Sequence, residues 1–125
     1  MKKTLALLAL ALSCLASHVT GVMAQNVVPP NVVKELAPSG KLRAAINFGN
    51  RVLAQKDAKT GEPKGITPDL ARELARRLGV PVEFVTFESA GAVFAAGKKG
   101  EWDIAFIAIE PVRAAEIEFT APYVI

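Results

Sequence analysis

The chain has 125 residues, of which 51% are hydrophobic, and it carries 15 lysines and arginines against 12 aspartates and glutamates. This composition is typical of one small, slightly basic globular domain. The first 24 residues need separate treatment, because Lys2 and Lys3 precede an apolar run from Leu5 to Leu15, and Val22-Met23-Ala24 ends in small residues. This pattern predicts a secretory signal peptide that is cleaved after Ala24.

Two alternatives for this segment are a membrane anchor and lipid attachment at Cys14. Ser13, Ser17 and His18 interrupt the apolar run, which is shorter than the ~20 residues that a bilayer requires. Residues 11–13, Ala-Leu-Ser, lack the leucine that usually stands three positions before a lipidated cysteine. We therefore expect cleavage and a periplasmic location.

Removal of this segment changes what the composition implies. The remaining 101 residues carry 13 basic and 12 acidic side chains and contain neither cysteine nor histidine. Such a nearly neutral chain offers no clustered basic face for nucleic acid. Zinc sites with Cys or His ligands, Ser-His-Asp or Cys-His nucleophiles and disulfide scaffolds are excluded. We expect no metal and no cofactor, so binding must use carboxylates, arginine, lysine, amides and backbone dipoles.

The first half of the mature chain begins with a proline-containing leader over 25–38, which becomes ordered near Val32 to Leu36. A strand is predicted over 41–48, followed by a hairpin-like excursion in which 52–55 and 64–67 flank a polar segment. A helix is predicted from Pro68 to Leu78, with Thr67 as its cap and Gly79 as its stop.

Leucines recur every four residues on this helix, so one face is expected to pack on a sheet. The opposite face carries Arg72, Arg76 and Arg77, which could form a binding patch. Asp69 and Glu73 offer these arginines local partners, and we favour a solvated face.

The second half continues the alternation of strands and helices. We predict, in order, a strand over 82–87, a helix over 90–96 capped by Ser89, a buried strand over 104–109, a short helical segment within 110–116, and extended segments at 118–120 and 123–125. Strands separated by helices indicate βαβ units around a mostly parallel α/β sheet. Such sheets bind ligands beyond the carboxyl ends of their strands.

The residues just past these strand ends are therefore candidates for a binding site: 47–50, 88–90 and 108–113. Arg113 follows the most apolar strand and could hold a carboxylate with two parallel hydrogen bonds. The alternative is a surface arginine paired with Glu110 or Glu116, each three residues away.

Several short motifs occur in a fixed order over 39–125. They are Gly40-Lys41-Leu42-Arg43, the 60–71 stretch TGEPKGITPDLA, Gly100-Glu101-Trp102-Asp103-Ile104, Pro111-Val112-Arg113 and Phe119-Thr120-Ala121-Pro122-Tyr123. Together they resemble the bacterial extracellular solute-binding proteins of family 3, the amino-acid-type receptors of ABC importers. The resemblance implies a monomeric receptor with a periplasmic binding protein type II fold, whose two lobes close over a small solute and deliver it to a membrane permease.

The resemblance also implies that Arg113 holds the α-carboxylate of the ligand. The chain departs from the family pattern at Ala108 and Glu110, where Ser or Thr is usual, and at Asn50, where an aromatic residue is common. Glu110 could accept from a ligand ammonium group or simply neutralise Arg113. Asn47, Phe48 and Asn50, after the first strand, are further contact candidates, whereas Trp102 is expected in the core.

A second function class on the same fold is a dehydratase of the cyclohexadienyl type, for which Glu110 or Glu88 would supply the acid. A third is a sensory module, for which the chain shows no signalling domain. Because members of the family are roughly twice as long, we expect the chain to be a partial sequence that carries most of lobe I over 39–125.

Overall fold

The computed structural model describes residues 27–123. The predicted signal peptide, its cleavage site and the end of the last predicted extended segment lie outside these residues. Within 27–123, no helix combines the length and the apolar character that crossing a membrane requires.

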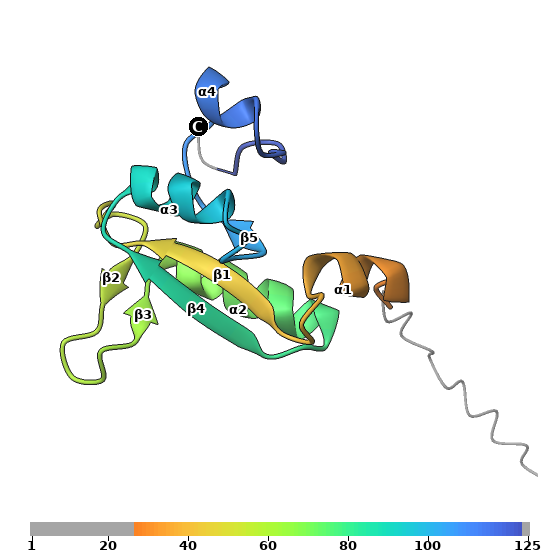
Figure 1. Ribbon diagram of the computed structural model, residues 1–125. Coiled ribbons are helices and arrows are strands. Elements are labelled where there is room, and N and C mark those ends of the chain that lie inside the picture. Colours follow the sequence, from red (N-terminus) through yellow and green to blue (C-terminus); the bar gives the residue numbers. More distant parts are fainter. Residues whose placement is uncertain (1–26, 124–125) are drawn as a thin grey trace, which may run out of the picture.

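Helices and strands alternate along the described chain (Figure 1). The elements are α1 (Pro30–Leu36), β1 (Leu42–Asn47), β2 (Gln55–Lys56), β3 (Pro63–Lys64), α2 (Ile66–Leu78), β4 (Val82–Phe87), α3 (Ala90–Gly97), β5 (Ile104–Ala105) and α4 (Pro111–Ala114). The predicted strands at 41–48 and 82–87 and the helix at 90–96 are confirmed within one residue at each end. The excursion is an antiparallel hairpin of β2 and β3.

The main sheet has the strand order β4-β1-β5, and both pairs of strands are parallel. The chain moves from β1 to one neighbour through α2 and then crosses to the other neighbour through α3. Right-handed crossovers in opposite directions place the two helices on opposite faces. Figure 1 shows α2 on one side of the sheet and α3 on the other. The predicted α/β architecture is confirmed.

The central strand β1 forms the middle of the core. Leu42, Ala44, Ala45 and Ile46 are fully buried, as expected for a parallel strand covered on both faces. The two alanines are small, which lets α2 and α3 approach the backbone of β1 closely. Leu42 packs with Ala75 and Leu78 of α2, and Val33 and Leu36 of α1 close the same cluster.

The helix α2 starts earlier than predicted. It begins at Ile66, so Thr67 lies inside the first turn, and its hydroxyl donates to the Leu53 carbonyl at 3.5 Å instead of capping the helix. Gly79 ends the helix in a left-handed conformation, with φ of 71°, as predicted. The predicted leucine face is shifted, because Ala71, Ala75 and Leu78 face the sheet whereas Leu70 is 40% exposed.

The arginines on the outer face of α2 have local partners. Arg72 pairs with Asp69, and Arg76 and Arg77 both pair with Glu73, at 2.7–2.9 Å. Arg72 also donates to the Pro63 carbonyl and covers the ring of Phe84. These contacts agree with a solvated face and leave no cluster of free guanidinium groups there among the described residues.

The predicted strand over 104–109 is wrong beyond its first two residues. Only Ile104 and Ala105 pair with β1, opposite Ala44 and Ala45. Among the described residues, β5 lies at the edge of the sheet, and the chain from Ala108 to Val112 is exposed. The predicted helical segment at 110–116 is a single short helix, α4.

A charged pair fixes the register between β1 and β5. Asp103 accepts from the Arg43 backbone at 2.8 Å and from its guanidinium at 2.6 and 3.2 Å, and the Asp103 side chain is only 5% exposed. The same guanidinium donates to the Gly100 carbonyl. The side-chain hydrogen bonds that Asp103 accepts raise the pKa of Arg43. Because Asp103 directly precedes β5, this pair also sets where residues 106–109 leave the sheet.

Candidate solute-binding site at the strand ends

The strand order of the sheet marks one position for a ligand. The first crossover leads from β1 to β4 on one side, and the second leads to β5 on the other side. The crossovers therefore lead to opposite sides of β1, and the switch point lies between β1 and β5. Open α/β sheets bind ligands beyond the carboxyl ends of their strands at such a point. Here those ends are Asn47 and Ala105.

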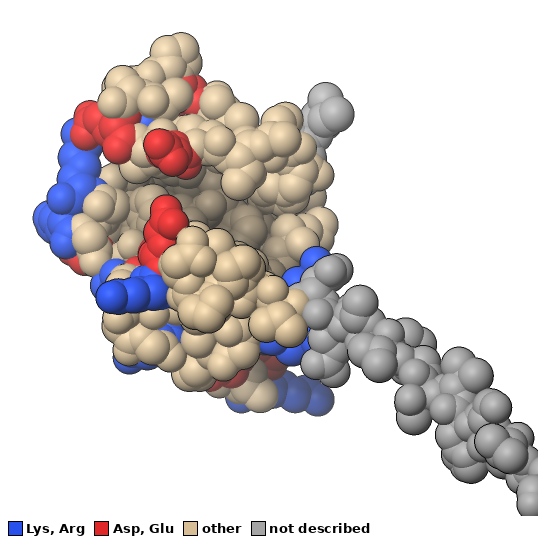
Figure 2. Space-filling view, turned by 90° about the vertical axis from the view of Figure 1, so that its right-hand side faces the viewer, with Lys and Arg blue, Asp and Glu red and all other residues tan. Residues whose placement is uncertain are grey.

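A cavity of about 890 Å³ lies at this switch point. Figure 2 shows it as a hollow whose visible floor carries no charged side chain, with acidic groups at its edge. It is called the large cavity below. Its lining comes from the end of β1, α2, the 102–109 segment and the 117–123 segment, and includes Asn47, Asn50, Leu70, Leu74, Phe106, Ala108, Ile109, Phe119 and Tyr123.

The wall of the large cavity is mainly apolar. Phe106 and Tyr123 meet edge to face, with ring centroids 5.9 Å apart and planes at 85°. Partial burial raises the pKa of the Tyr123 hydroxyl. Trp102 forms part of the wall and also packs against Gly97, and its Nε1 donates to the Val93 carbonyl at 2.8 Å. Trp102 thus packs on α3, but it is only partly buried and also lines the large cavity, so its expected place in the core is only partly correct.

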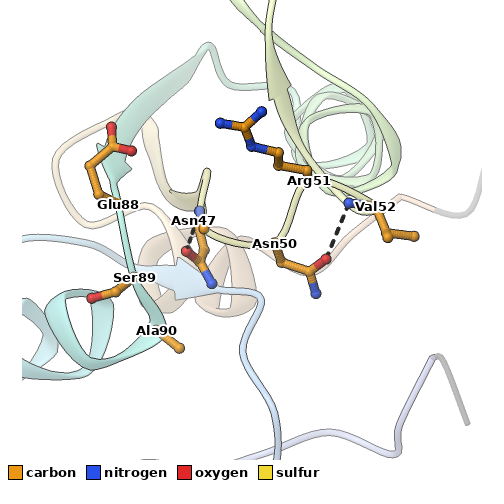
Figure 3. Close-up of a pocket in the computed structure, with 8 residues that line it drawn as sticks. Asn47, Asn50, Arg51, Val52, Glu88, Ser89 and Ala90 are labelled. Carbon is orange, nitrogen blue, oxygen red and sulfur yellow. Dashed lines mark hydrogen bonds between the residues drawn. The ribbon is translucent and has the colours of Figure 1, made fainter.

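A second cavity, of about 570 Å³, lies at the carboxyl ends of β1 and β4. It is called the small cavity below, and Figure 3 shows it from close by. The loop after β1 contributes one wall and the β4–α3 junction contributes the other. Its lining residues are Asn47, Gly49, Asn50, Arg51, Val52, Glu88, Ser89 and Ala90.

The two asparagines shape the loop between the cavities. Asn47 Oδ1 accepts from the Gly49 amide at 2.9 Å, and Asn50 Oδ1 accepts from the Val52 amide at 3.3 Å (Figure 3). Each oxygen is thus used in a turn, while neither side-chain NH₂ group has a partner among the described residues. A Cβ on Gly49 would collide with the Glu88 carbonyl, so glycine lets this loop approach the end of β4.

Arg113 is held by its own segment. Its side chain is 12% exposed, and its Nη1 donates to the Ala108 carbonyl at 3.0 Å and lies 3.2 Å from the Glu110 carboxylate. Glu110 itself is 48% exposed. The structure thus contains the ion pair that was the alternative to a ligand contact. Among the described residues, the Arg113 side chain is connected to the large cavity only through Ala108, whose carbonyl it contacts and which lines that cavity.

Eight of the residues that line the cavities lie in segments that the sequence singled out, but the seven named candidates are not one cluster. Asn47 and Asn50 line both cavities, Glu88 lines the small one and Ala108 the large one. Phe48, Glu110 and Arg113 line neither. Sequence reasoning missed Arg51 and Val52, which directly follow the predicted strand-end segment and could have been included by extending it two residues.

Residues 49–125, more than half of the chain, match the bacterial extracellular solute-binding proteins, family 3. Among solved structures, an ancestral cationic amino acid solute-binding protein, AncCDT-1, is 32% identical with a TM-score of 0.64, over 74% of this chain and 41% of that one. A variant of an ancestral cyclohexadienyl dehydratase, AncCDT-3, is 26% identical with a TM-score of 0.64, over 74% of this chain and 38% of that one.

A third similar structure is the arginine-bound form of domain 1 of TmArgBP, the ArgBP of T. maritima. It is 26% identical with a TM-score of 0.62, and the match covers 71% of each chain. No curated protein matches the sequence. The chain thus spans about 41% of the length of AncCDT-1 but 71% of the isolated domain.

Proposed function

Since the chain belongs to the bacterial extracellular solute-binding proteins of family 3, we propose that it captures an amino-acid-like solute through the solute's carboxylate and serves an ABC importer. Its lobe has the type II periplasmic binding protein fold, and the family implies a secreted, periplasmic protein with a substrate-binding role. Residues 39–125 form lobe I in this proposal, after a signal peptide over 1–24 and a leader over 25–38. The receptor acts as a monomer and delivers its ligand to a permease.

The observation that carries the proposal is the large cavity at the switch point, with Arg113 beside it. The Arg113 guanidinium is largely shielded from solvent, and the Ala108 carbonyl holds it next to the cavity wall. A planar guanidinium recognises a carboxylate through two parallel hydrogen bonds. The Glu110 carboxylate lies 3.2 Å from Nη1 of Arg113. A ligand carboxylate therefore binds the guanidinium either in place of Glu110 or beside it.

The similar structures indicate which solute to test first. AncCDT-1 is described as a cationic amino acid solute-binding protein, and domain 1 of TmArgBP was solved with arginine bound. The second shows that a single domain of that protein holds a ligand. L-arginine is therefore the first probe, and agmatine is its matched control because it lacks only the α-carboxylate.

Isothermal titration calorimetry of the purified chain with the two compounds tests the proposal. We expect L-arginine to bind at least about tenfold more tightly than agmatine, because a charge-assisted carboxylate contact contributes about 1.5–3 kcal/mol. The Arg113→Gln variant should lose most of this preference and bind agmatine as the parent does. Arg77→Gln, on the outer face of α2, is the control and should leave both affinities unchanged.

Equal binding of arginine and agmatine by the parent chain would contradict the carboxylate contact. Glu110→Thr separates the two roles that the sequence leaves open for Glu110. If Glu110 only neutralises Arg113, the variant binds arginine more tightly and keeps its selectivity. If Glu110 accepts from a ligand ammonium group, the variant loses its preference for ligands with that group.

The similarity to AncCDT-3 supports one other candidate function, a dehydratase. Its acid would be Glu88 or Glu110, yet both side chains are exposed to solvent and Glu110 is paired with Arg113. A general acid is usually tuned by burial in an apolar site. Incubation with prephenate or arogenate tests this candidate, since formation of an aromatic product would replace the binding proposal by an enzymatic one.

A further inference from the structure

The large and small cavities share part of their walls. Asn47, Asn50 and Ala90 line both of them, so these residues form the partition between the two spaces. Ala90, the first residue of α3, contributes only a methyl group to this partition, so little side-chain volume separates the two cavities there. Each cavity alone has the size of an ordinary ligand pocket, which is about 300–1,000 Å³. A ligand that lies across the partition would use both.

The small cavity is lined by two side chains of opposite charge that form no ion pair with other described residues. Arg51 lies on the loop after β1 and Glu88 at the end of β4, and neither forms an ion pair with another described residue. Figure 3 shows the Arg51 guanidinium extending toward the side of the cavity on which Glu88 lies. Asn47 and Asn50 also line the small cavity, and their side-chain oxygens are already engaged, which leaves their NH₂ groups available.

These groups are complementary to a zwitterion. A carboxylate fits a guanidinium and amide NH₂ donors, and an ammonium group fits a free carboxylate. A ligand end with a positive charge alone would leave Arg51 facing a like charge, and a negative end alone would do the same to Glu88. A group with both charges satisfies both side chains at once.

We infer that the preferred solute is an elongated bis-amino acid: one end carries the carboxylate that binds beside Arg113 at the large cavity, and the other end is a second amino-acid head group that binds between Arg51 and Glu88. The inference rests on the proposed function and specifies its substrate class. Ala90 is the specificity-determining residue, because its small side chain lets the linking methylene groups cross from one cavity to the other.

Four compounds of similar length isolate the distal group. meso-2,6-Diaminopimelate carries a distal ammonium and a distal carboxylate, L-lysine only the ammonium, L-2-aminopimelate only the carboxylate, and L-norleucine neither. In titration calorimetry of the purified chain we expect diaminopimelate to bind about tenfold more tightly than lysine or aminopimelate, as one exposed charge-assisted contact permits. Norleucine should bind most weakly. Added salt should reduce these differences, since the small cavity is open to solvent.

Conservative variants assign each charge. Arg51→Gln should make diaminopimelate no better than lysine, and Glu88→Gln should make it no better than aminopimelate. Both positions are exposed, so loss of folding does not confuse the result. Ala90→Leu places a larger side chain between the two cavities. It should weaken the binding of diaminopimelate by about tenfold or more relative to the binding of L-serine, which is short enough to stay in one cavity. Arg77→Gln and Glu101→Gln are controls of the same chemistry outside the cavities.

The outcomes separate this inference from the function on which it rests. If the chain binds amino acids but does not prefer diaminopimelate to lysine and aminopimelate, the inference is wrong and the proposed function stands. The inference is also wrong if Arg51→Gln and Glu88→Gln leave the order of the four ligands unchanged. Binding of none of the amino acids overturns both. A preference for diaminopimelate that each variant removes as described supports both.

Discussion

Gly97 is the residue at which α3 and Trp102 meet. A Cβ at this position would clash with atoms of the indole ring, whose Nε1 donates to Val93 in the same helix. Gly97→Ala must therefore displace the ring or bend the end of α3. Forcing an extra methyl group into a packed site costs about 1–3 kcal/mol, and we expect a loss of that size in the free energy of unfolding, measured by urea denaturation.

Gly91 provides the matched control on the same helix. The nearest atom to a Cβ there is the Ser89 hydroxyl oxygen at 3.9 Å, so Gly91→Ala meets open space. Alanine in a helix is favoured over glycine by about 0.5–1 kcal/mol, and this variant should be slightly more stable than the parent. Equal effects of the two substitutions would show that Trp102 does not depend on Gly97.

For single residues, the sequence predicts which segment reaches the site better than it predicts the contacts that each side chain makes. The ends of β1 at Asn47 and of β4 at Phe87 could be placed within one residue because alternating strands and helices determine where a parallel sheet is open. Arg113 could be identified as a carboxylate candidate, but its hydrogen bond to the Ala108 carbonyl and its pairing with Glu110 depend on the path of a short irregular segment. Phe48 directly follows Asn47 at the end of β1 yet lines neither cavity, because successive residues of an extended chain point in opposite directions.

Helix α2 shows what local pattern can and cannot predict for an element. Its glycine stop follows from local geometry and is correct, whereas its start is set by contacts with a distant loop. The Thr67 amide donates to the Leu53 carbonyl at 3.1 Å, which extends the helix to Ile66. Similarly, the apolar run after Asp103 has the composition of a long strand, but only Ile104 and Ala105 pair with β1. The composition of a segment indicates that it is buried, but it does not specify which strand the segment pairs with.

The outer face of α2 also makes a pH-dependent contribution to stability. Hydrogen bonds from Arg76 and Arg77 lower the pKa of Glu73 from its ordinary value of 4.5 to about 2. Since the folded state then binds fewer protons than the unfolded state between these values, the contribution is complete above about pH 5 and is lost as the pH falls toward 2. Glu73→Gln should be less stable than the parent at pH 7, and the difference should shrink toward pH 2.

Urea denaturation of parent and variant over this pH range measures the effect. Glu62→Gln is the control, because Glu62 forms no ion pair within residues 27–123. It should follow the parent at every pH. A constant difference between the Glu73 variant and the parent from pH 7 to pH 2 would mean that the pair with Arg76 and Arg77 contributes nothing to folding.

For the whole molecule, the important feature is apolar surface beside the large cavity. Leu70 is 40% and Ile109 is 50% exposed, and both line it; Val112 on the neighbouring α4 is 63% exposed. Exposed apolar side chains that are contiguous, unlike scattered ones, mark surfaces that bind ligands or other protein surfaces. We therefore expect the isolated chain to bind a hydrophobic dye such as ANS and to bind its solute weakly, because one face of the site is open.

A double variant, Leu70→Lys with Ile109→Lys, tests whether this surface is the cause. It should reduce the ANS fluorescence enhancement of the parent by at least about half, because two charges interrupt a patch whose binding depends on continuous apolar area. Val27→Lys is the control, since Val27 is 79% exposed but lines neither cavity. The expectation is wrong if the parent chain gives no dye signal, unfolds sharply on heating and binds arginine with micromolar affinity. In that case residues 27–123 would form a closed site by themselves, and the exposure of Leu70 and Ile109 would have no consequence for binding.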